Sequence, residues 1–477
     1  MESPIIPKVI REKTKYCFEC GICTASCPMV ELLSTHYNPR SLLQKALNEP
    51  EKTLDDDKLW LCAWCYKCYK RCPQGLKPPE IFQLLKNRAM KLGLFNGFKR
   101  ATSIMKEKVP FPLICWYACF HPERAEIGDK KITEVLKKLA KQPKLAKGIE
   151  EDSNHKDKVA IIGSGPAGLT AASILAEIGY PVTIFEALPE AGGMLRKSMP
   201  KYRLPRKVLE SEIQRLRDLG VKLRTGTKVS KDISFDEIKQ DGYKAIFVAV
   251  GAHKSRKLGI EGEELERVVD ALDFLWKVNT QQQVNLGKKV GIIGGGNVAI
   301  DAARTALLQG AKEVIILYRR SREEMLANPW EVAEAEKEGV KIKFLVTPVR
   351  ISEKEGRVQG LKCVRMKLGV LDETGRKKPM PIEGSEFSLK LDTVIVAIGE
   401  TTETTFLPEN LEVDKGGWVQ VNPFTMETNI AGVFAGGDMV TGPATVIEAI
   451  LAGKKAAYSI NQYLTRIRKK EENHCGD

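Results

Sequence analysis

The sequence predicts an α/β chain with two doubly wound parallel sheets, preceded by a separate α-helical domain. Two glycine-rich turns predict the sheets, because each turn follows a short apolar strand and opens a helix. Two cysteine quartets before residue 73, separated by helix-like segments, predict the N-terminal domain. The length of 477 residues suits about three domains.

The two quartets share one spacing, in which three cysteines separated by two residues precede a fourth cysteine and a proline. Bacterial ferredoxins use this spacing, and their fourth cysteine ligates the other cluster. We predict one [4Fe–4S] cluster on Cys17, Cys20, Cys23 and Cys72, and a second on Cys62, Cys65, Cys68 and Cys27. Structural zinc and unligated thiols are the alternatives, but zinc ribbons use two Cys-x2-Cys pairs.

The remaining cysteines have weaker assignments. Cys115 and Cys119 cannot hold a cubane alone, so we interpret them as a structural remnant. A further cluster that also uses His121 or Glu123 is the alternative. Cys363 is expected in the core and Cys475 as a free thiol. Residues 93–155 are rich in lysine and predict a helical connector, with helix-like spacing around residues 135–139.

The first glycine turn is a G-x-G-x-x-G that runs from Gly163 to Gly168. Its glycines allow the backbone to approach a pyrophosphate, and the following helix supplies N–H donors and partial positive charge. Glu186, 23 residues after Gly163, ends the next predicted strand. A carboxylate there accepts the ribose hydroxyls of an adenosine, so the segment predicts a dinucleotide site.

The second glycine turn, at residues 294–299, has the form G-x-G-x-x-A. The strand that follows ends in arginines, Arg319 and Arg320, where an NAD site carries an acid. A guanidinium binds a ribose 2′-phosphate that a carboxylate would repel, which favours NADP(H) over NAD(H). A solvated arginine loop beside an NAD(H) site is the alternative.

Further segments carry a resemblance to a known family. They are residues 192–195 with 200–205, residues 319–325, and residues 436–438 with 442–449. Together with the turns they resemble the glutamate synthase small-subunit family over about residues 156–465. The resemblance implies a glutathione reductase-like arrangement with an NAD(P) domain (281–400) inserted into an FAD domain (156–280 and 401–477).

The resemblance also implies site residues. The residues expected to bind FAD are Gly163, Gly165, Pro166, Ala167, Gly168, Glu186, Gly193, Arg203, Val229, Gly437, Asp438, Ala444, Thr445 and Val446. The residues expected to bind NAD(P) are Gly294, Gly296, Asn297, Val298, Arg319, Arg320 and Gly399. Pro443 is expected to open the last helix, whose positive end would face the flavin.

Two departures qualify the resemblance. Residues 198–200 read Ser-Met-Pro where the family commonly has Gly-Ile-Pro, which leaves the flavin potential open. The stretch 187–203 contains no cysteine and the second domain contains only Cys363, so the chain lacks the redox-active cysteine pair of flavin disulfide reductases.

Residues 10–92 resemble the C subunit of heterodisulfide reductase, an α-helical ferredoxin. The Cys-Gly-Ile-Cys, Asn-Pro-Arg and Leu-Trp-Leu-Cys segments and the helical link between the quartets carry this resemblance. It implies a ferredoxin domain, residues 1–92, that passes electrons to a partner subunit.

Composition restricts the function further. The net charge is +14, but the lysines and arginines are interleaved with acidic residues. No nucleic-acid-binding motif is present. The N-terminus has no apolar signal region, and the longest apolar stretch near the start of the chain, residues 110–120, is too short for a membrane span. We therefore expect a cytoplasmic protein, with an acidic redox partner as one use of the charge.

The expected function is electron transfer between NAD(P)H and a partner subunit through FAD and two [4Fe–4S] clusters. No catalytic side chain is predicted, because hydride transfer to a flavin needs none. An electron-bifurcating NAD(P)/ferredoxin oxidoreductase subunit and a non-catalytic assembly protein are the alternatives.

Overall fold

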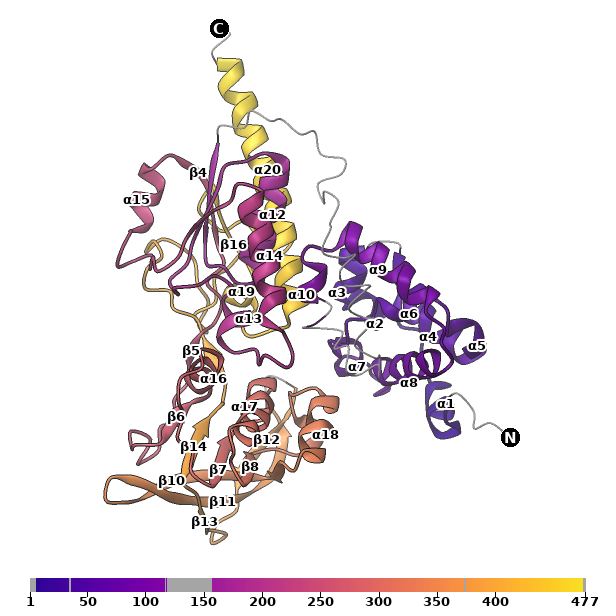
Figure 1. Ribbon diagram of the computed structural model, residues 1–477, viewed down its shortest axis with the longest axis vertical. Helices are drawn as coiled ribbons and strands as arrows, with labels where there is room; N and C mark the ends of the chain where they lie inside the picture. The colour runs from indigo at the N-terminus through magenta and orange to yellow at the C-terminus, as the bar shows by residue number, and fades with distance from the viewer. Residues whose placement is uncertain (1–5, 34–35, 116, 118–156, 373–374, 475–477) are drawn as a thin grey trace. The chain divides into compact units, whose positions relative to one another are not determined.

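The computed structural model describes residues 6–33, 36–115, 117, 157–372 and 375–474. The described chain divides into two compact units. The first comprises residues 1–193, 203–251 and 404–477, and the second comprises residues 194–202 and 252–403. Figure 1 shows the chain coloured in order from the N-terminus to the C-terminus, with most helices and strands labelled.

The N-terminal part of the first unit is α-helical, as expected. Its helices are α1 (Lys8–Thr14), α2 (Ile22–Ala25), α3 (Pro28–Leu33), α4 (Pro39–Asn48), α5 (Pro50–Thr53), α6 (Asp57–Trp60), α7 (Lys67–Lys70), α8 (Pro78–Lys91), α9 (Asn96–Lys108) and α10 (Pro112–Cys115). Asn38 caps α4, because its side-chain oxygen accepts the N–H groups of Arg40 and Ser41 at 3.0 and 3.1 Å. The Asn-Pro-Arg segment therefore fixes the start of the helix that links the two quartets.

The rest of the first unit is a parallel sheet with the strand order β16-β4-β1-β2-β3. Its strands are β1 (Lys158–Ile162), β2 (Val182–Phe185), β3 (Lys222–Arg224), β4 (Tyr243–Val248) and β16 (Val433–Ala435). Its helices are α12 (Pro166–Ile178), α14 (Arg206–Asp218), α15 (Phe235–Gln240), α19 (Asp438–Thr441) and α20 (Val446–His474). Helices α12, α14 and α20 lie side by side along the sheet (Figure 1), and α12 packs against both others. The last four residues of β1 and of β4 are buried, which explains why each of these runs is apolar.

The second unit contains a second parallel sheet, with the order β6-β14-β7-β8-β9. Its strands are β6 (Val268–Asp270), β7 (Lys289–Ile293), β8 (Glu313–Tyr318), β9 (Lys341–Phe344) and β14 (Thr393–Val396). Its helices are α13 (Met194–Lys197), α16 (Ala271–Asn279), α17 (Asn297–Leu308), η4 (Arg322–Glu324) and α18 (Pro329–Lys337). Strand β6 pairs with β14, so the unit starts at Ala252, earlier than the expected boundary at residue 281.

An antiparallel arm completes the second unit. It is built from β10 (Val346–Lys354), β11 (Arg357–Leu371), β12 (Lys377–Pro381) and β13 (Phe387–Lys390). The short strands β5 (Lys254–Ser255) and β15 (Glu400–Thr401) pair with each other. Cys363, on β11, is fully buried, as expected of a core residue. No helix in the described ranges is long and apolar enough to cross a bilayer.

Several expectations fall on residues outside the described ranges. Cys119, His121, Glu123, Cys475 and residues 135–139 are among them. Within the described part of the connector, α9 and α10 are helical, as predicted. Cys115 ends α10 in a buried position, and its thiol lies 3.8 Å from the carbonyl oxygen of Pro110.

Candidate iron–sulfur and dinucleotide sites

The four cysteines predicted for the first cluster line one cavity. Cys17, Cys20 and Cys23 contribute from the first loop, and Cys72 reaches the same cavity from the second quartet. Cys68 also lines it. The crossed arrangement in which the fourth cysteine joins the other loop therefore fits this geometry.

The second predicted set is also gathered, with deeper burial. Burial raises the pKa of Cys27 to about 12, and the neighbouring Cys65 and Cys62 contribute to the rise. Burial likewise raises the pKa of Cys65 to about 11, and the pKa of Cys68 well above its usual range with Cys62, Cys65 and Cys27 nearby. With pKa values this high the free side chains would be neutral thiols, and the positive irons of a cubane would allow them to bind as thiolates.

The backbone repeats itself in the two cysteine loops. Glu19 and Trp64, each two residues after the first cysteine, have φ values of 51° and 53°. Gly21 and Tyr66, two residues further on, have φ values of 77° and 57°, and a short helix starts directly after each. Left-handed backbone is costly for Trp and Tyr, so its recurrence indicates a shared structural demand. Wrapping three cysteines around one corner of a cubane is such a demand.

The described cysteines do not converge on a point. Among the residues that the structure describes, no group of three or more His, Cys, Asp or Glu side chains is placed to hold a single metal ion. The first cysteine set lines a cavity instead, and the cysteines of the second set lie near one another.

The first glycine turn connects β1 to α12 and is closely packed. A Cβ at Gly168 would lie 2.0 Å from the carbonyl oxygen of Gly163, and one at Gly193 would lie 2.8 Å from the Cα of Gly165. A Cβ at Gly165 meets no protein atom within 4 Å, so the space in front of this turn is open. Pro166 occupies the first turn of α12, and Ala167 is buried beside it. The turn therefore offers the close backbone approach and helix N-terminus that a pyrophosphate requires.

Glu186 follows β2 and lies against this turn. Its carboxylate accepts the backbone N–H of Ser164 at 2.9 Å and the N–H of Leu188 at 2.8 Å, and it also contacts the Ser164 hydroxyl. The Ser164 hydroxyl in turn accepts the N–H of Gly192 at 2.9 Å. Each carboxylate oxygen can accept more than one hydrogen bond, so this geometry leaves capacity for ribose hydroxyls.

The C-terminal segment places Asp438 beside the start of α20. Gly437 takes a φ of 70°, and the Asp438 carboxylate accepts the N–H of Ala444 at 3.2 Å. Burial raises the pKa of Asp438 to about 6. The expectation that Pro443 opens the helix is wrong: α20 begins at Val446.

Thr445 precedes Val446 and takes the capping role instead of Pro443. The Thr445 N–H and hydroxyl both donate to Glu448, at 3.1 and 2.7 Å. A glutamate three residues after the capping position is a known helix-start arrangement. The positive end of this 29-residue helix thus lies at residues 445–446.

For Arg203 and Val229, also expected near the flavin, the structure shows burial. Arg203 lies just before α14, and Val229 lies in the core of the first unit. The departing Ser-Met-Pro loop belongs to the second unit, where the Asn279 side chain donates to the carbonyls of Arg196, Lys197 and Met199 at 3.1–3.2 Å. Sequence reasoning did not single out Asn279.

The second glycine turn connects β7 to α17. A Cβ at Gly294 would lie 2.1 Å from the carbonyl oxygen of Ala397, whereas one at Gly296 meets no protein atom within 4 Å. Asn297 and Val298 start α17, and the Asn297 side chain accepts the N–H of Asn328 at 2.9 Å. Gly399, with a φ of 115°, follows β14 on the neighbouring strand. This turn has the same open approach as the first.

The two arginines after β8 occupy different environments. Arg319 is exposed, whereas Arg320 is buried and donates to Asp372 at 2.6 Å and to the Lys377 carbonyl at 3.0 Å. Arg320 is thus engaged by the antiparallel arm. Burial and the positive charge of the adjacent Arg320 lower the pKa of Arg319. Asp372 is a second residue that sequence reasoning missed.

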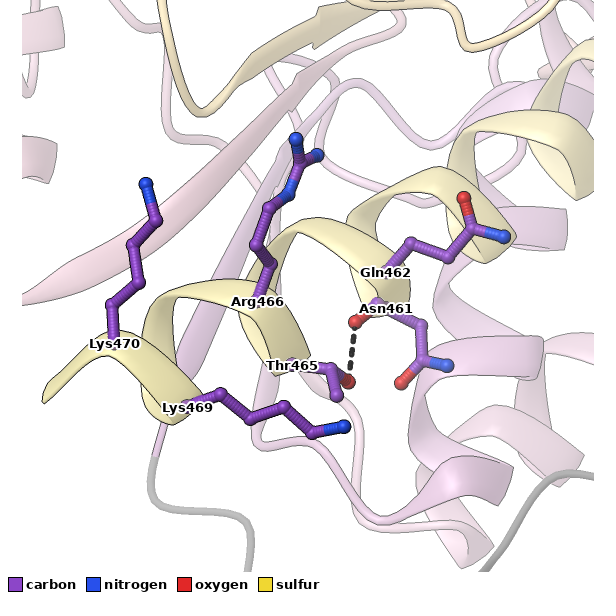
Figure 2. A pocket seen from close by; sticks show the side chains of 6 residues that line it. All are labelled: Asn461, Gln462, Thr465, Arg466, Lys469 and Lys470. Carbon is purple, nitrogen blue, oxygen red and sulfur yellow. Dashed lines mark hydrogen bonds between the residues drawn. The ribbon is translucent and has the colours of Figure 1, made fainter. Parts of the chain in front are cut away.

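A shallow hollow lies on the surface of α20, many residues after the start of that helix. Figure 2 shows its lining by Asn461, Gln462, Thr465, Arg466, Lys469 and Lys470. Thr465 bonds to the carbonyl of Asn461 at 2.8 Å. Asn461 is about 22 Å along the helix from Val446, at 1.5 Å per residue. The hollow therefore lies on the later part of α20 and not at the helix start beside Asp438.

These sites define the chain as an oxidoreductase with an iron–sulfur domain. Residues 157–453 match the family described as pyridine nucleotide-disulphide oxidoreductase, and residues 13–76 match the 4Fe-4S dicluster domain. The chain belongs to the pyridine nucleotide-disulphide oxidoreductase family. The matches confirm the expected fusion of an N-terminal iron–sulfur domain with a flavin and nicotinamide module, and the family implies FAD.

Relatives of known name agree with this assignment. The chain is 40% identical to the NADP(+)-dependent formate dehydrogenase subunit beta of Moorella thermoacetica over 83% of its length, and 38% identical to the NADPH-Fe(3+) oxidoreductase subunit beta of Geobacter sulfurreducens over 83%. It spans 60% and 63% of those two proteins. A glutamate synthase [NADPH] small chain from Halomonas elongata is 35% identical over 70% of this chain and 73% of its own length, which confirms the resemblance expected from the motifs.

A solved structure confirms the fold class. Mycobacterium tuberculosis FprA in complex with NADPH aligns with a TM-score of 0.58, at 20% identity, over 67% of this chain and 86% of FprA. At this identity the likeness establishes the fold alone.

Proposed function

We propose that the chain is an electron-transfer subunit that passes electrons between NADP(H) and a partner redox subunit through FAD and two [4Fe–4S] clusters. The observation that carries the proposal is the presence in one chain of two open glycine turns and two gathered cysteine sets. A flavin accepts electron pairs from a nicotinamide and releases single electrons to clusters. We expect the protein to work in the reducing cytoplasm, where cluster thiols stay reduced.

The rim of the first cysteine cavity supports transfer to a partner. Cys20 is exposed, and the side chains of Tyr16 and Phe18 beside it are 69% and 68% exposed. Large apolar side chains at a redox centre suit docking of a second protein. Two relatives are named as the beta subunit of a formate dehydrogenase and of an Fe(3+) oxidoreductase, which supports assembly with a separate subunit.

The chain's own residues would bind the two dinucleotides, orient them and polarise the flavin ring. The turns at Gly165 and Gly296 allow close approach of two pyrophosphates, and Glu186 offers acceptors for the adenosine ribose. The N-terminus of α20 provides donors and positive potential for an anionic ring or phosphate. Asp438, whose burial raises its pKa to about 6, is placed to hold a proton or a hydrogen bond at that helix start.

The choice of NADP(H) depends on Arg319. Its exposed guanidinium is available to pair with a 2′-phosphate, while Arg320 holds the loop through Asp372 and the Lys377 carbonyl. We expect Arg319→Ala to raise KM for NADPH about tenfold with little change for NADH, because one charge-assisted contact is lost. Dye reduction by the anaerobically purified protein measures this.

Arg320→Lys is the informative companion variant. It should lower the unfolding midpoint and weaken both nucleotides together, because one amine cannot replace two directed guanidinium bonds. Equal losses for NADPH and NADH in Arg319→Ala would overturn the 2′-phosphate role. Failure of the unaltered protein to reduce any dye with either nucleotide would overturn the proposed function.

A further inference from the structure

The short helix α7 connects two of the cysteines predicted for the second cluster. Lys67 lies between Cys65 and Cys68 on this helix, and its ammonium forms an ion pair with Glu448 near the start of α20. The side chains are 32% and 17% exposed, so the pair is partly shielded from water. A cluster-binding loop therefore contacts the helix start at the expected FAD site.

The Glu448 carboxylate is shared between the two sites. One oxygen pairs with Lys67, and the other accepts the N–H and hydroxyl of Thr445 at 3.1 and 2.7 Å. Thr445 is one of the residues expected at FAD, and Asp438 is bonded to the adjacent Ala444. A single side chain thus links the loop of Cys65 and Cys68 to the flavin-side segment.

A second contact to α20 is made next to Cys27, another cysteine of the same set. Helix α3 begins directly after Cys27, and its Glu31 pairs with Lys455 of α20 at 2.5 Å. Lys454 donates to the Leu32 carbonyl of α3 at 3.3 Å. Helix α7, which contains Cys68, and helix α3, which follows Cys27, therefore both contact α20, whereas Tyr16 and Phe18, next to Cys17, are exposed.

We propose that the cluster on Cys27, Cys62, Cys65 and Cys68 exchanges electrons with the flavin, and that the Lys67–Glu448 pair positions it. The inference rests on the proposed function and adds the order in which electrons pass the two clusters. The cluster on Cys17, Cys20, Cys23 and Cys72 is then the one that faces the partner. A fully reduced flavin would supply two electrons, one at a time. Each oxidised cluster would accept one of them, and the two protons would pass to water. Lys67 is a positioning residue in this scheme.

The test uses charge reversal and charge exchange in the intact holoprotein. In Lys67→Glu, reduction of the clusters after mixing with NADPH should slow about tenfold, because like charges now meet at the contact. Bleaching of the flavin should keep its rate. The exchanged pair Lys67→Glu with Glu448→Lys should recover cluster reduction, with FAD content measured because Glu448 also holds Thr445. Lys58→Glu, at an exposed position on α6 of the same domain, is the control and should match the unaltered protein.

Amide hydrogen exchange gives a readout that does not depend on turnover. Amides of α7 and the first turns of α20 should exchange faster in Lys67→Glu and recover in the exchanged pair, with iron content unchanged. Unaltered exchange and cluster reduction in Lys67→Glu would overturn the positioning role. If NADPH never reduces the clusters of the unaltered protein, the proposed function fails, while the exchange data still decide whether the contact exists.

Discussion

Gly165→Ala should leave the protein folded but free of FAD, and Gly296→Ala should leave FAD bound but no longer reduced by NADPH. At both positions a Cβ would meet no protein atom within 4 Å, and φ values of −69° and −96° are ordinary for alanine. The added methyl would occupy only the space that the pyrophosphate needs. A misplacement of about 1 Å costs about hundredfold in rate, so we expect at least that loss for Gly296→Ala.

The two variants are controls for each other. FAD content is measured by absorbance after release, folding by the thermal midpoint, and NADPH-dependent flavin bleaching by stopped flow. Gly168→Ala gives the contrast, because its Cβ would lie 2.0 Å from a backbone oxygen and the turn itself must shift. Full FAD content in Gly165→Ala, or unimpaired bleaching in Gly296→Ala, would contradict the assigned sites.

Cys72→Ser should remove the same cluster as Cys20→Ser, and Cys27→Ser should remove the same cluster as Cys65→Ser. Cys72 lines the cavity of Cys17, Cys20 and Cys23, although it lies in the other quartet. Cys27 is partly buried and lies near Cys62 and Cys65. Each substitution should lower iron from about eight to about four atoms per chain, because a cubane requires its four thiolates.

Electron paramagnetic resonance of the reduced protein distinguishes the two clusters. Paired variants should lose the same signal, and Cys115→Ser, outside both sets, should keep both signals and about eight irons. The crossed assignment fails if Cys72→Ser loses the signal that Cys65→Ser loses. About twelve irons in the unaltered protein would instead indicate a third cluster.

The parts of the fold that could be predicted depend on local sequence alone. After an exposed first lysine, strands β1 and β7 are apolar because both faces are buried, and each is followed by a turn where only glycine fits, at Gly163 and Gly294. Each turn, with its flanking strand and helix, is contiguous in sequence. The cysteine spacing is equally local, so cluster ligands could also be proposed without a structure.

What could not be predicted depends on contacts between distant segments. Glu448 appeared only as part of a motif, and its pairing with Lys67 brings together residues from opposite ends of the chain. Arg320 was expected at the nucleotide, but Asp372 on the antiparallel arm engages it. Pro443 carries an ordinary helix-start signal, yet Thr445 and Glu448 form the cap. In each case tertiary contacts decided between locally reasonable alternatives.

An anaerobic titration with NADPH, followed by visible absorbance and paramagnetic resonance, tests the central claim most directly. The account predicts that the isolated chain bleaches its flavin and also develops both cluster signals, taking up about four electrons, two at FAD and one at each cluster. Uptake of only about two electrons, with a bleached flavin and silent clusters under conditions where dithionite reduces them, would contradict a continuous path from nicotinamide to iron–sulfur centres.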